Sequence, residues 1–153
     1  MRIIAVFLVL ASLACSREVT GPRPFGDALP IDVTSSPASD TSQWAGFSFQ
    51  DNLIYLSGRM ATPDPCYELS AYRSIQGNEL RVTIVATRRA KSCPSSIARF
   101  DYQSVTDIPA CPHLTVWYHF EGSGWPDRKV MDQTWLCAST TASRDRQAAG
   151  RLM

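Results

Sequence analysis

Four of the five cysteines are spaced so that their thiols could form two disulfides. They are Cys66, Cys93, Cys111 and Cys137. None belongs to a C-x-x-C pair, the close spacing that is typical of structural zinc sites. An even number of cysteines in an exported chain favours disulfides, which persist in oxidising compartments. Two disulfides and no metal are therefore expected, with a zinc site as the alternative.

The fifth cysteine, Cys15, follows a segment that is typical of an export signal. Arg2 precedes an unbroken apolar run, residues 3–10, and small residues lead from there to the cysteine. Residues 1–14 are therefore predicted to be a signal peptide. The apolar run is well short of the roughly 20 residues that a membrane-spanning helix needs, so it is not expected to remain as a membrane span.

The segment Ser12-Leu13-Ala14-Cys15 resembles the lipobox of bacterial lipoproteins. In that family the signal is removed before the cysteine, and the cysteine then receives acyl chains. The resemblance implies that Cys15 anchors the mature protein to a membrane. Ser16 stands where inner-membrane lipoproteins tend to have Asp, which implies the outer membrane and a periplasmic or surface-facing domain. Ordinary secretion with cleavage near Ala14 is the alternative, because the commonest lipobox has Leu at the position of Ser12.

Short motifs that commonly mark catalytic centres do not occur in this sequence: G-x-S-x-G, H-E-x-x-H, a phosphate-binding glycine loop and an EF-hand. Ser123, between two glycines, is typical of a turn. His113 and His119 would lie about 20 Å apart on one strand, too far to share a metal ion. Asp132 and Glu121 are expected on opposite faces of a hairpin, which argues against a cooperating carboxylate pair. We predict no enzymatic activity and no cofactor.

The charge balance argues against nucleic acid as a partner. The formal net charge is +1, and residues 44–138 contain equal numbers of basic and acidic side chains. Such a chain lacks the positive field on which affinity for a phosphate backbone mainly depends. The basic run Arg88–Lys91 could contact a polysaccharide or an anionic headgroup, although such runs are usually solvated connections.

Three of the four tryptophans, Trp117, Trp125 and Trp135, lie in or around one predicted hairpin. Core packing would explain them, and so would an aromatic patch that contacts a partner. Alternation along the strand predicts that one face of the hairpin carries Trp117 and Trp135 together with His113, Thr115, Met131 and Gln133. That face is the predicted partner-binding surface, and Trp125 is expected nearby.

Alternating apolar and polar residues predict about seven strands between Trp44 and Ala138. The expected strands are residues 44–50, 53–60, 66–74, 80–87, 97–104, 113–121 and 129–138. Without a helical period, this pattern favours an antiparallel β-sandwich over residues 44–138. Residues 15–43, rich in Pro, Ser and Thr, are predicted to be a flexible lipid-anchored linker, and residues 139–153 a disordered tail. Strand number and cysteine placement resemble the immunoglobulin-like domains of uncharacterised small bacterial lipoproteins, with another sandwich topology or a small barrel as the alternative.

The register of the second predicted hairpin predicts one disulfide, between Cys111 and Cys137. A turn centred on Gly124 places Cys111 opposite Cys137, because facing residues in an antiparallel hairpin have a constant sum of numbers. The same register places His113 opposite Trp135 and Trp117 opposite Met131.

The register of the first predicted hairpin gives weaker support for the other disulfide, between Cys66 and Cys93. A turn at Gly77-Asn78 places Cys66 opposite Arg89, four residues before Cys93. A bridge between Cys66 and Cys93 therefore needs a bulge or a chain reversal in residues 89–92.

These observations predict a non-enzymatic lipoprotein of the cell envelope whose β-sandwich is a binding or interaction module. The expected partners are the membrane, through the lipid anchor, and an envelope protein or polysaccharide. The alternative is a small secreted inhibitor of an enzyme such as a protease, which would present the disulfide-framed loop 122–127. The sequence identifies neither the ligand nor the oligomeric state.

Overall fold

The computed structural model describes residues 24–107 and 113–134, and these residues form strands and turns without a helix. Nine strands occur in order: β1 (Asp27–Leu29), β2 (Ile31–Pro37), β3 (Trp44–Gln50), β4 (Leu53–Thr62), β5 (Tyr67–Gln76), β6 (Glu79–Arg88), β7 (Ala98–Asp107), β8 (His113–Glu121) and β9 (Arg128–Thr134). The described part of the chain contains no helix long and apolar enough to cross a membrane. The all-β prediction is therefore confirmed, and the strands expected at residues 44–50 and 113–121 have the predicted bounds.

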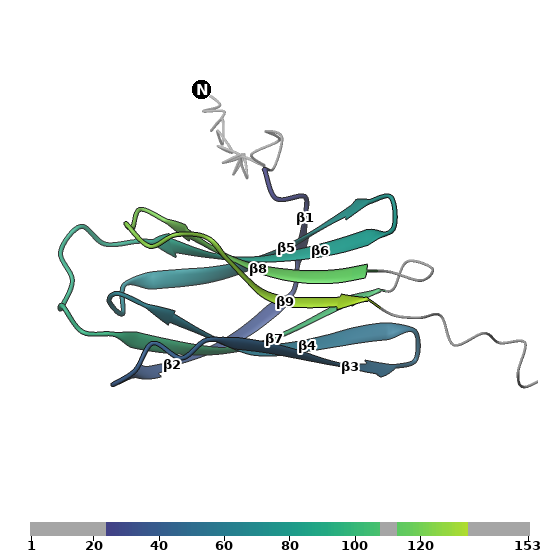
Figure 1. The fold of residues 1–153 in the computed structure, drawn as a ribbon. Helices are drawn as coiled ribbons and strands as arrows, with labels where there is room; N and C mark the ends of the chain where they lie inside the picture. The colour runs from purple at the N-terminus through teal and green to yellow at the C-terminus, as the bar shows by residue number, and fades with distance from the viewer. Residues whose placement is uncertain (1–23, 108–112, 135–153) are drawn as a thin grey trace, which may run out of the picture.

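Two sheets face each other as two layers (Figure 1). One has the strand order β1-β5-β6-β8-β9, and the other has the order β2-β7-β4-β3. All neighbouring strands are antiparallel except β6 and β8, which are parallel. The prediction of a fully antiparallel sandwich was thus wrong for this pair of strands. The physical reason is that β7, which separates β6 from β8 in the chain, belongs to the opposite sheet, so the chain returns to β6 in the same direction.

The domain begins earlier than Trp44, because residues 27–37 of the predicted linker form β1 and β2. Strand β1 pairs with β5, and β2 pairs with β7, so each covers a strand that would otherwise be an edge. Leu29 and Ile31 also pack against the hydrophobic core. The flexible-linker prediction is wrong for these residues, since backbone pairing and two apolar side chains compensate for their polar composition.

The register of the first hairpin is confirmed. Gln76 pairs with Glu79 across the turn, where Gly77 has a positive φ of 60°. At the far end the Arg89 backbone N–H donates to the Cys66 carbonyl at 2.9 Å, as the constant-sum rule requires. Strand β6 ends at Arg88, and the following segment brings Cys93 to Cys66, with which it forms a disulfide.

The register of the second hairpin differs from the prediction, by one residue at His113 and by two residues at Trp117. His113 pairs with Thr134, not with Trp135, and Val116 pairs with Met131. A β-bulge then skips Val130, so Trp117 pairs with Lys129 rather than with Met131. Met131 consequently packs against the core instead of joining Trp117 on the outer face. Trp135, Cys111 and Cys137 lie outside the described residues, and the Cys111–Cys137 pairing stays a prediction.

The core lies between the inner faces of the two sheets. Its largest fully buried side chains come from β4, β6 and β8: Tyr118, Ile54, Leu56, Met60, Leu80, Ile84, Leu114, Val82, Val116 and Thr62. Strand β8 contributes every second residue to this core, so its other residues, Thr115, Trp117 and His119, point to the outer face of the five-stranded sheet. This alternation decides which β8 side chains can belong to a surface site.

Candidate binding site

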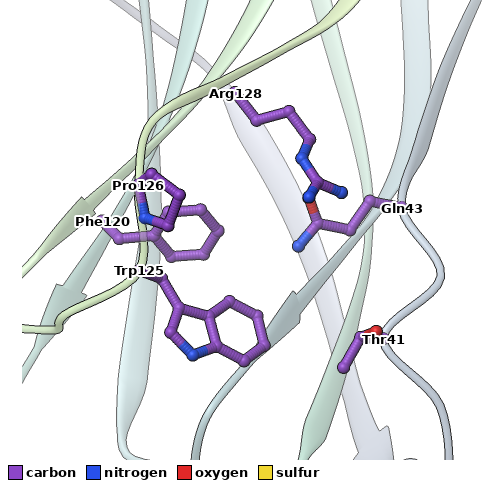
Figure 2. Close-up of a pocket in the computed structure, with 6 residues that line it drawn as sticks. All are labelled: Thr41, Gln43, Phe120, Trp125, Pro126 and Arg128. Carbon is purple, nitrogen blue, oxygen red and sulfur yellow. The ribbon is translucent and has the colours of Figure 1, made fainter.

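A cavity of about 220 Å³ opens at the side of the sandwich, where edge strand β3 of one sheet approaches edge strand β9 of the other. The segment before β3, the end of β8, the β8–β9 turn and the start of β9 all contribute to it (Figure 2). Its lining consists of Thr41, Gln43, Phe120, Trp125, Pro126 and Arg128. Of these, only Trp125 is among the site residues predicted from the sequence.

One wall of the cavity is apolar and held in place by the β8–β9 turn. The Trp125 ring packs edge-on against the Phe120 ring, with centroids 5.5 Å apart. The turn is fixed on both sides, because the Trp125 backbone N–H donates to Ser123 Oγ at 3.1 Å and the Asp127 carboxylate binds His119 Nδ1 at 2.8 Å. Trp125 remains half-buried, so part of its indole faces the cavity (Figure 2).

The opposite wall is polar, and it includes an acceptor without a donor. Gln43 Nε2 donates to the Ala61 carbonyl at 3.3 Å, which fixes the orientation of the amide. Gln43 Oε1 is buried and accepts no hydrogen bond from the described residues. A buried acceptor that loses water without gaining a donor costs about 1–3 kcal/mol. In this structure the oxygen has almost no accessible surface, so a ligand hydroxyl could bond to it, and recover that free energy, only after the Gln43 side chain moved towards the cavity.

Among the described residues that line the cavity, Arg128 supplies the only charged side chain. It is exposed, and it has no ion-pair partner in residues 24–107 and 113–134. The part of the lining that the structure describes has no carboxylate, imidazole or thiol, the groups that usually transfer protons in catalysis. The arrangement is suited to holding a ligand between an aromatic ring and hydrogen-bonding groups.

The structure separates the predicted partner-binding residues. Trp117 lies on the outer face of the five-stranded sheet, whereas Trp125 packs against Phe120, whose side chain is buried. The Trp117 ring is covered by two cations, since Arg81 Cζ lies 5.3 Å and Lys129 Nζ 5.9 Å from its centroid. The Trp117 surface is therefore an aromatic ring between cationic side chains rather than an open aromatic patch.

The neighbours of Trp117 are already engaged with one another. His113 Nε2 contacts the Asp132 carboxylate, which also binds Lys129. Thr115 Oγ1 is buried and donates to Glu79 Oε1 at 2.8 Å. The hydrogen bond from Thr115 is the largest effect that lowers the pKa of Glu79 below its usual value. This face is a network of paired charges. Met131 and Gln133, which were predicted to belong to it, lie on the other side of β9.

The two histidines have separate carboxylate partners, Asp132 for His113 and Asp127 for His119. Asp132 pairs in register with Thr115, so it shares the outer face with Glu121. The prediction of opposite faces for these two carboxylates was wrong because the bulge shifts the register. Glu121 nevertheless binds Thr87, at 2.9 Å, and not Asp132 or its partners.

The basic run Arg88–Lys91 is partly neutralised. Arg88 pairs with Asp64 at 3.1 Å, and Arg89 pairs with Glu68 at 2.5 Å. Asp64 also lies beside Cys66 and Cys93, within 4.8 Å of both sulfurs. Because those sulfurs are joined in a disulfide, they do not offer the thiolates that a zinc site needs.

A second surface with aromatic side chains occurs on the four-stranded sheet and was missed in the sequence. Trp44 is 45% exposed and Tyr55 is 41% exposed. The Trp44 ring lies over Gly46, where an added Cβ would be 3.5 Å from it. A hollow of about 370 Å³ adjoins this ring, with Asp32 and Gln103 in its lining. The available signal was the alternation of Trp44 with Gly46 and Ser48 on one face of β3.

No signal in the sequence pointed to Gln43, Thr41 or Arg128. Gln43 and Arg128 are far apart in the chain, and only the packing of β3 beside β9 brings them to one cavity. No protein-family model matches this chain, and neither a curated protein nor a solved structure matches it.

Proposed function

We propose that this protein is a non-enzymatic lipoprotein of the cell envelope whose β-sandwich binds carbohydrate, with one sugar ring in the cavity beside Trp125. The observation that carries the proposal is that the cavity has one apolar wall and one polar wall. Trp125, Phe120 and Pro126 offer apolar surface, while Gln43 and Thr41 offer hydrogen-bonding groups across from them (Figure 2). A sugar ring has an apolar C–H face and a rim of hydroxyls, so it complements both walls.

The size of the cavity supports a sugar rather than a protein partner. A volume of about 220 Å³ corresponds to roughly seven waters at about 30 Å³ each, which is comparable to a single sugar ring. A stable protein interface usually buries about 800 Å² on each partner, so a protein would also have to contact the surface around this hollow. Polysaccharide is therefore the better supported of the two envelope partners expected from the sequence.

Export and lipid anchoring remain part of the proposal. The Cys66–Cys93 disulfide suits an oxidising compartment, which agrees with a cleaved signal and an acylated Cys15. Mass spectrometry of the membrane fraction tests the anchor: an N-terminal acylated Cys15 is expected. An unmodified soluble protein that begins near Ala14 would contradict it. The immunoglobulin-like assignment is likewise a proposal supported by two facing sheets, from which the parallel β6–β8 pair is a departure.

Titration with envelope oligosaccharides, selected on a glycan array, tests the binding function. Trp125→Ala should weaken binding by at least about tenfold, since one stacked aromatic surface is lost. Trp44→Ala is the matched control, because it removes an exposed indole from another surface. Thermal melts show whether each variant is folded, and Thr41→Val provides a second cavity variant outside the core. If Trp44→Ala loses affinity while Trp125→Ala keeps it, the sugar lies on the four-stranded sheet and the cavity assignment is wrong.

The inhibitor alternative has less structural support. Its candidate loop, residues 122–127, is bound to the domain through the Trp125–Phe120 ring contact and the Asp127–His119 ion pair. A loop that enters the active site of a hydrolase needs accessible residues, whereas two of these side chains are engaged within the domain. Recovery of a hydrolase from envelope extract, with no sugar bound, would favour the inhibitor over a sugar-binding module.

A further inference from the structure

We propose that the sugar in this cavity carries a carboxylate and that Arg128 binds it. The inference rests on the proposed function and adds the chemical class of the ligand, an acidic sugar. Arg128 is the first residue of β9, and its guanidinium lies on the same side of the cavity as the Gln43 amide, across from the Trp125 ring (Figure 2).

Arg128 differs from every other arginine that the structure describes. The other six each have an acidic partner within 4.0 Å: Arg59 and Arg99 with Asp101, Arg73 with Asp107, Arg81 with Glu79, Arg88 with Asp64 and Arg89 with Glu68. Asp127, the neighbour of Arg128 in the chain, binds His119 instead. In residues 24–107 and 113–134, therefore, only Arg128 has a guanidinium without a carboxylate, and that guanidinium borders a cavity whose lining has no acidic side chain.

The chemistry of arginine favours an oxyanion as the missing partner. A guanidinium presents parallel N–H donors that match the two oxygens of a carboxylate, and such charge-assisted pairs are stronger than neutral hydrogen bonds. A carboxylate carries one negative charge, which the single cation of the lining can balance. A phosphate monoester carries about −1.5 to −2 at neutral pH and would leave an excess of charge against one arginine.

Gln43 explains why the carboxylate should belong to a sugar rather than to a simple organic acid. Its buried Oε1 lacks a donor, and once the side chain moves towards the ligand a hydroxyl can supply one, whereas a free carboxylate cannot. A sugar acid combines the required groups, since its hydroxyls can donate to Gln43 Oε1, its ring can lie against Trp125, and its carboxylate can reach Arg128. All three groups act on one ring, which suits a cavity of about 220 Å³.

The test compares two oligosaccharides of equal length and linkage, one of glucuronic acid and one of glucose, by calorimetric titration of the full chain. Wild type should bind the glucuronic acid oligosaccharide about tenfold more tightly, the gain typical of one charged hydrogen-bonded pair. Arg128→Gln should reduce that ratio to near one, because both affinities are compared within the same variant and only the acidic sugar loses a charged partner. Arg128→Lys, which keeps the charge but loses the parallel N–H donors of the guanidinium, should give an intermediate ratio.

Lys91→Gln is the matched control, because it removes one exposed positive charge from the surface run Arg88–Lys91 and should leave the ratio unchanged. The inference is overturned if wild type binds both oligosaccharides equally, if Arg128→Gln keeps the preference, or if Lys91→Gln loses it. Tighter binding of a glucose phosphate than of glucuronic acid would also overturn it, in favour of phosphate. Binding of the glucose oligosaccharide alone contradicts this inference but leaves the sugar-binding function standing, whereas binding of no saccharide at all contradicts both.

Discussion

The phenol oxygens of Tyr102 and Tyr118 lie 3.0 Å apart between the two sheets. Tyr118 Oη also donates to the Trp44 carbonyl at 2.7 Å, so its single proton is used there and Tyr102 is the donor to Tyr118. Both rings are buried and meet edge to face. Strands β7, β8 and β3 are thereby joined through one chain of polar groups inside an otherwise apolar core.

Tyr118→Phe should destabilise the domain more than Tyr102→Phe. Loss of the Tyr118 hydroxyl removes two hydrogen bonds, the one to the Trp44 carbonyl and the one from Tyr102, at about 1–3 kcal/mol for each buried group that is left unsatisfied. Loss of the Tyr102 hydroxyl leaves the bond to the Trp44 carbonyl intact. Urea unfolding of the two variants measures the difference, and an equal or reversed order would contradict the proposed direction of the hydrogen bonds.

The same tyrosines should make the fold sensitive to alkali. Burial raises the pKa of Tyr102 from 10.0 to about 12, and burial also raises the pKa of Tyr118. Above about pH 10 the unfolded chain loses phenol protons that the folded chain retains, so the free energy of unfolding falls as the pH rises. Stability should be fully present below pH 10 and decline towards pH 12. Urea midpoints over this range measure the slope, which Tyr102→Phe should reduce; an unchanged slope would exclude Tyr102 as a cause.

Gly58→Ala should be strongly destabilising. A Cβ at this position would lie 2.4 Å from Tyr102 Oη and 2.7 Å from the Trp44 carbonyl oxygen, so the polar chain between the sheets would have to shift. Overpacking of a core costs typically about 1–3 kcal/mol, and disruption of the hydrogen bonds adds to it. Gly124→Ala is the control, because no atom lies within 4 Å of an added Cβ there. Similar melting temperatures for the two variants would contradict the prediction.

Loss of the Cys66–Cys93 disulfide should cost about 3–4 kcal/mol in the chain-entropy model, given a sequence separation of 27. The double variant Cys66→Ser/Cys93→Ser measures this by urea unfolding under non-reducing conditions. Peptide mapping without reductant checks the pairing and, independently, the predicted bridge between Cys111 and Cys137. A fragment that joins Cys66 or Cys93 to either of the other two cysteines would contradict both pairings.

The sequence predicted elements whose signal is local. Strands β3 and β8 show a period of two along their own length, and the turn at Gly77 sets the register of β5 against β6. Strands β1 and β2 were not predicted from the sequence because their residues are mostly polar and gain stability from pairing with distant strands. The bulge at Val130 was not predicted, although it interrupts the alternation of β9: two consecutive apolar residues, Val130 and Met131, both pack against the core.

The candidate site was harder to predict than the fold, for a physical reason. Trp125 drew attention by residue type alone, whereas Gln43 and Arg128 are ordinary residues whose importance depends on the neighbours they lack. Whether an acceptor or a cation lacks a partner is decided by the packed structure. All of its neighbours must be placed before the missing partner can be recognised. A single sequence therefore reveals the aromatic wall of such a cavity before its polar wall.

The parallel pairing of β6 with β8 also constrains how the chain can reach its folded state. The β5–β6 hairpin needs only a short turn, whereas β8 pairs with β6 across a longer segment that includes β7 of the other layer. Strand β2 likewise pairs with β7, which is distant from it in the chain, and closing such loops is costly in chain entropy. Folding should accordingly be slow for a domain of this size, in the range of milliseconds to seconds, with both layers assembling in a single cooperative step.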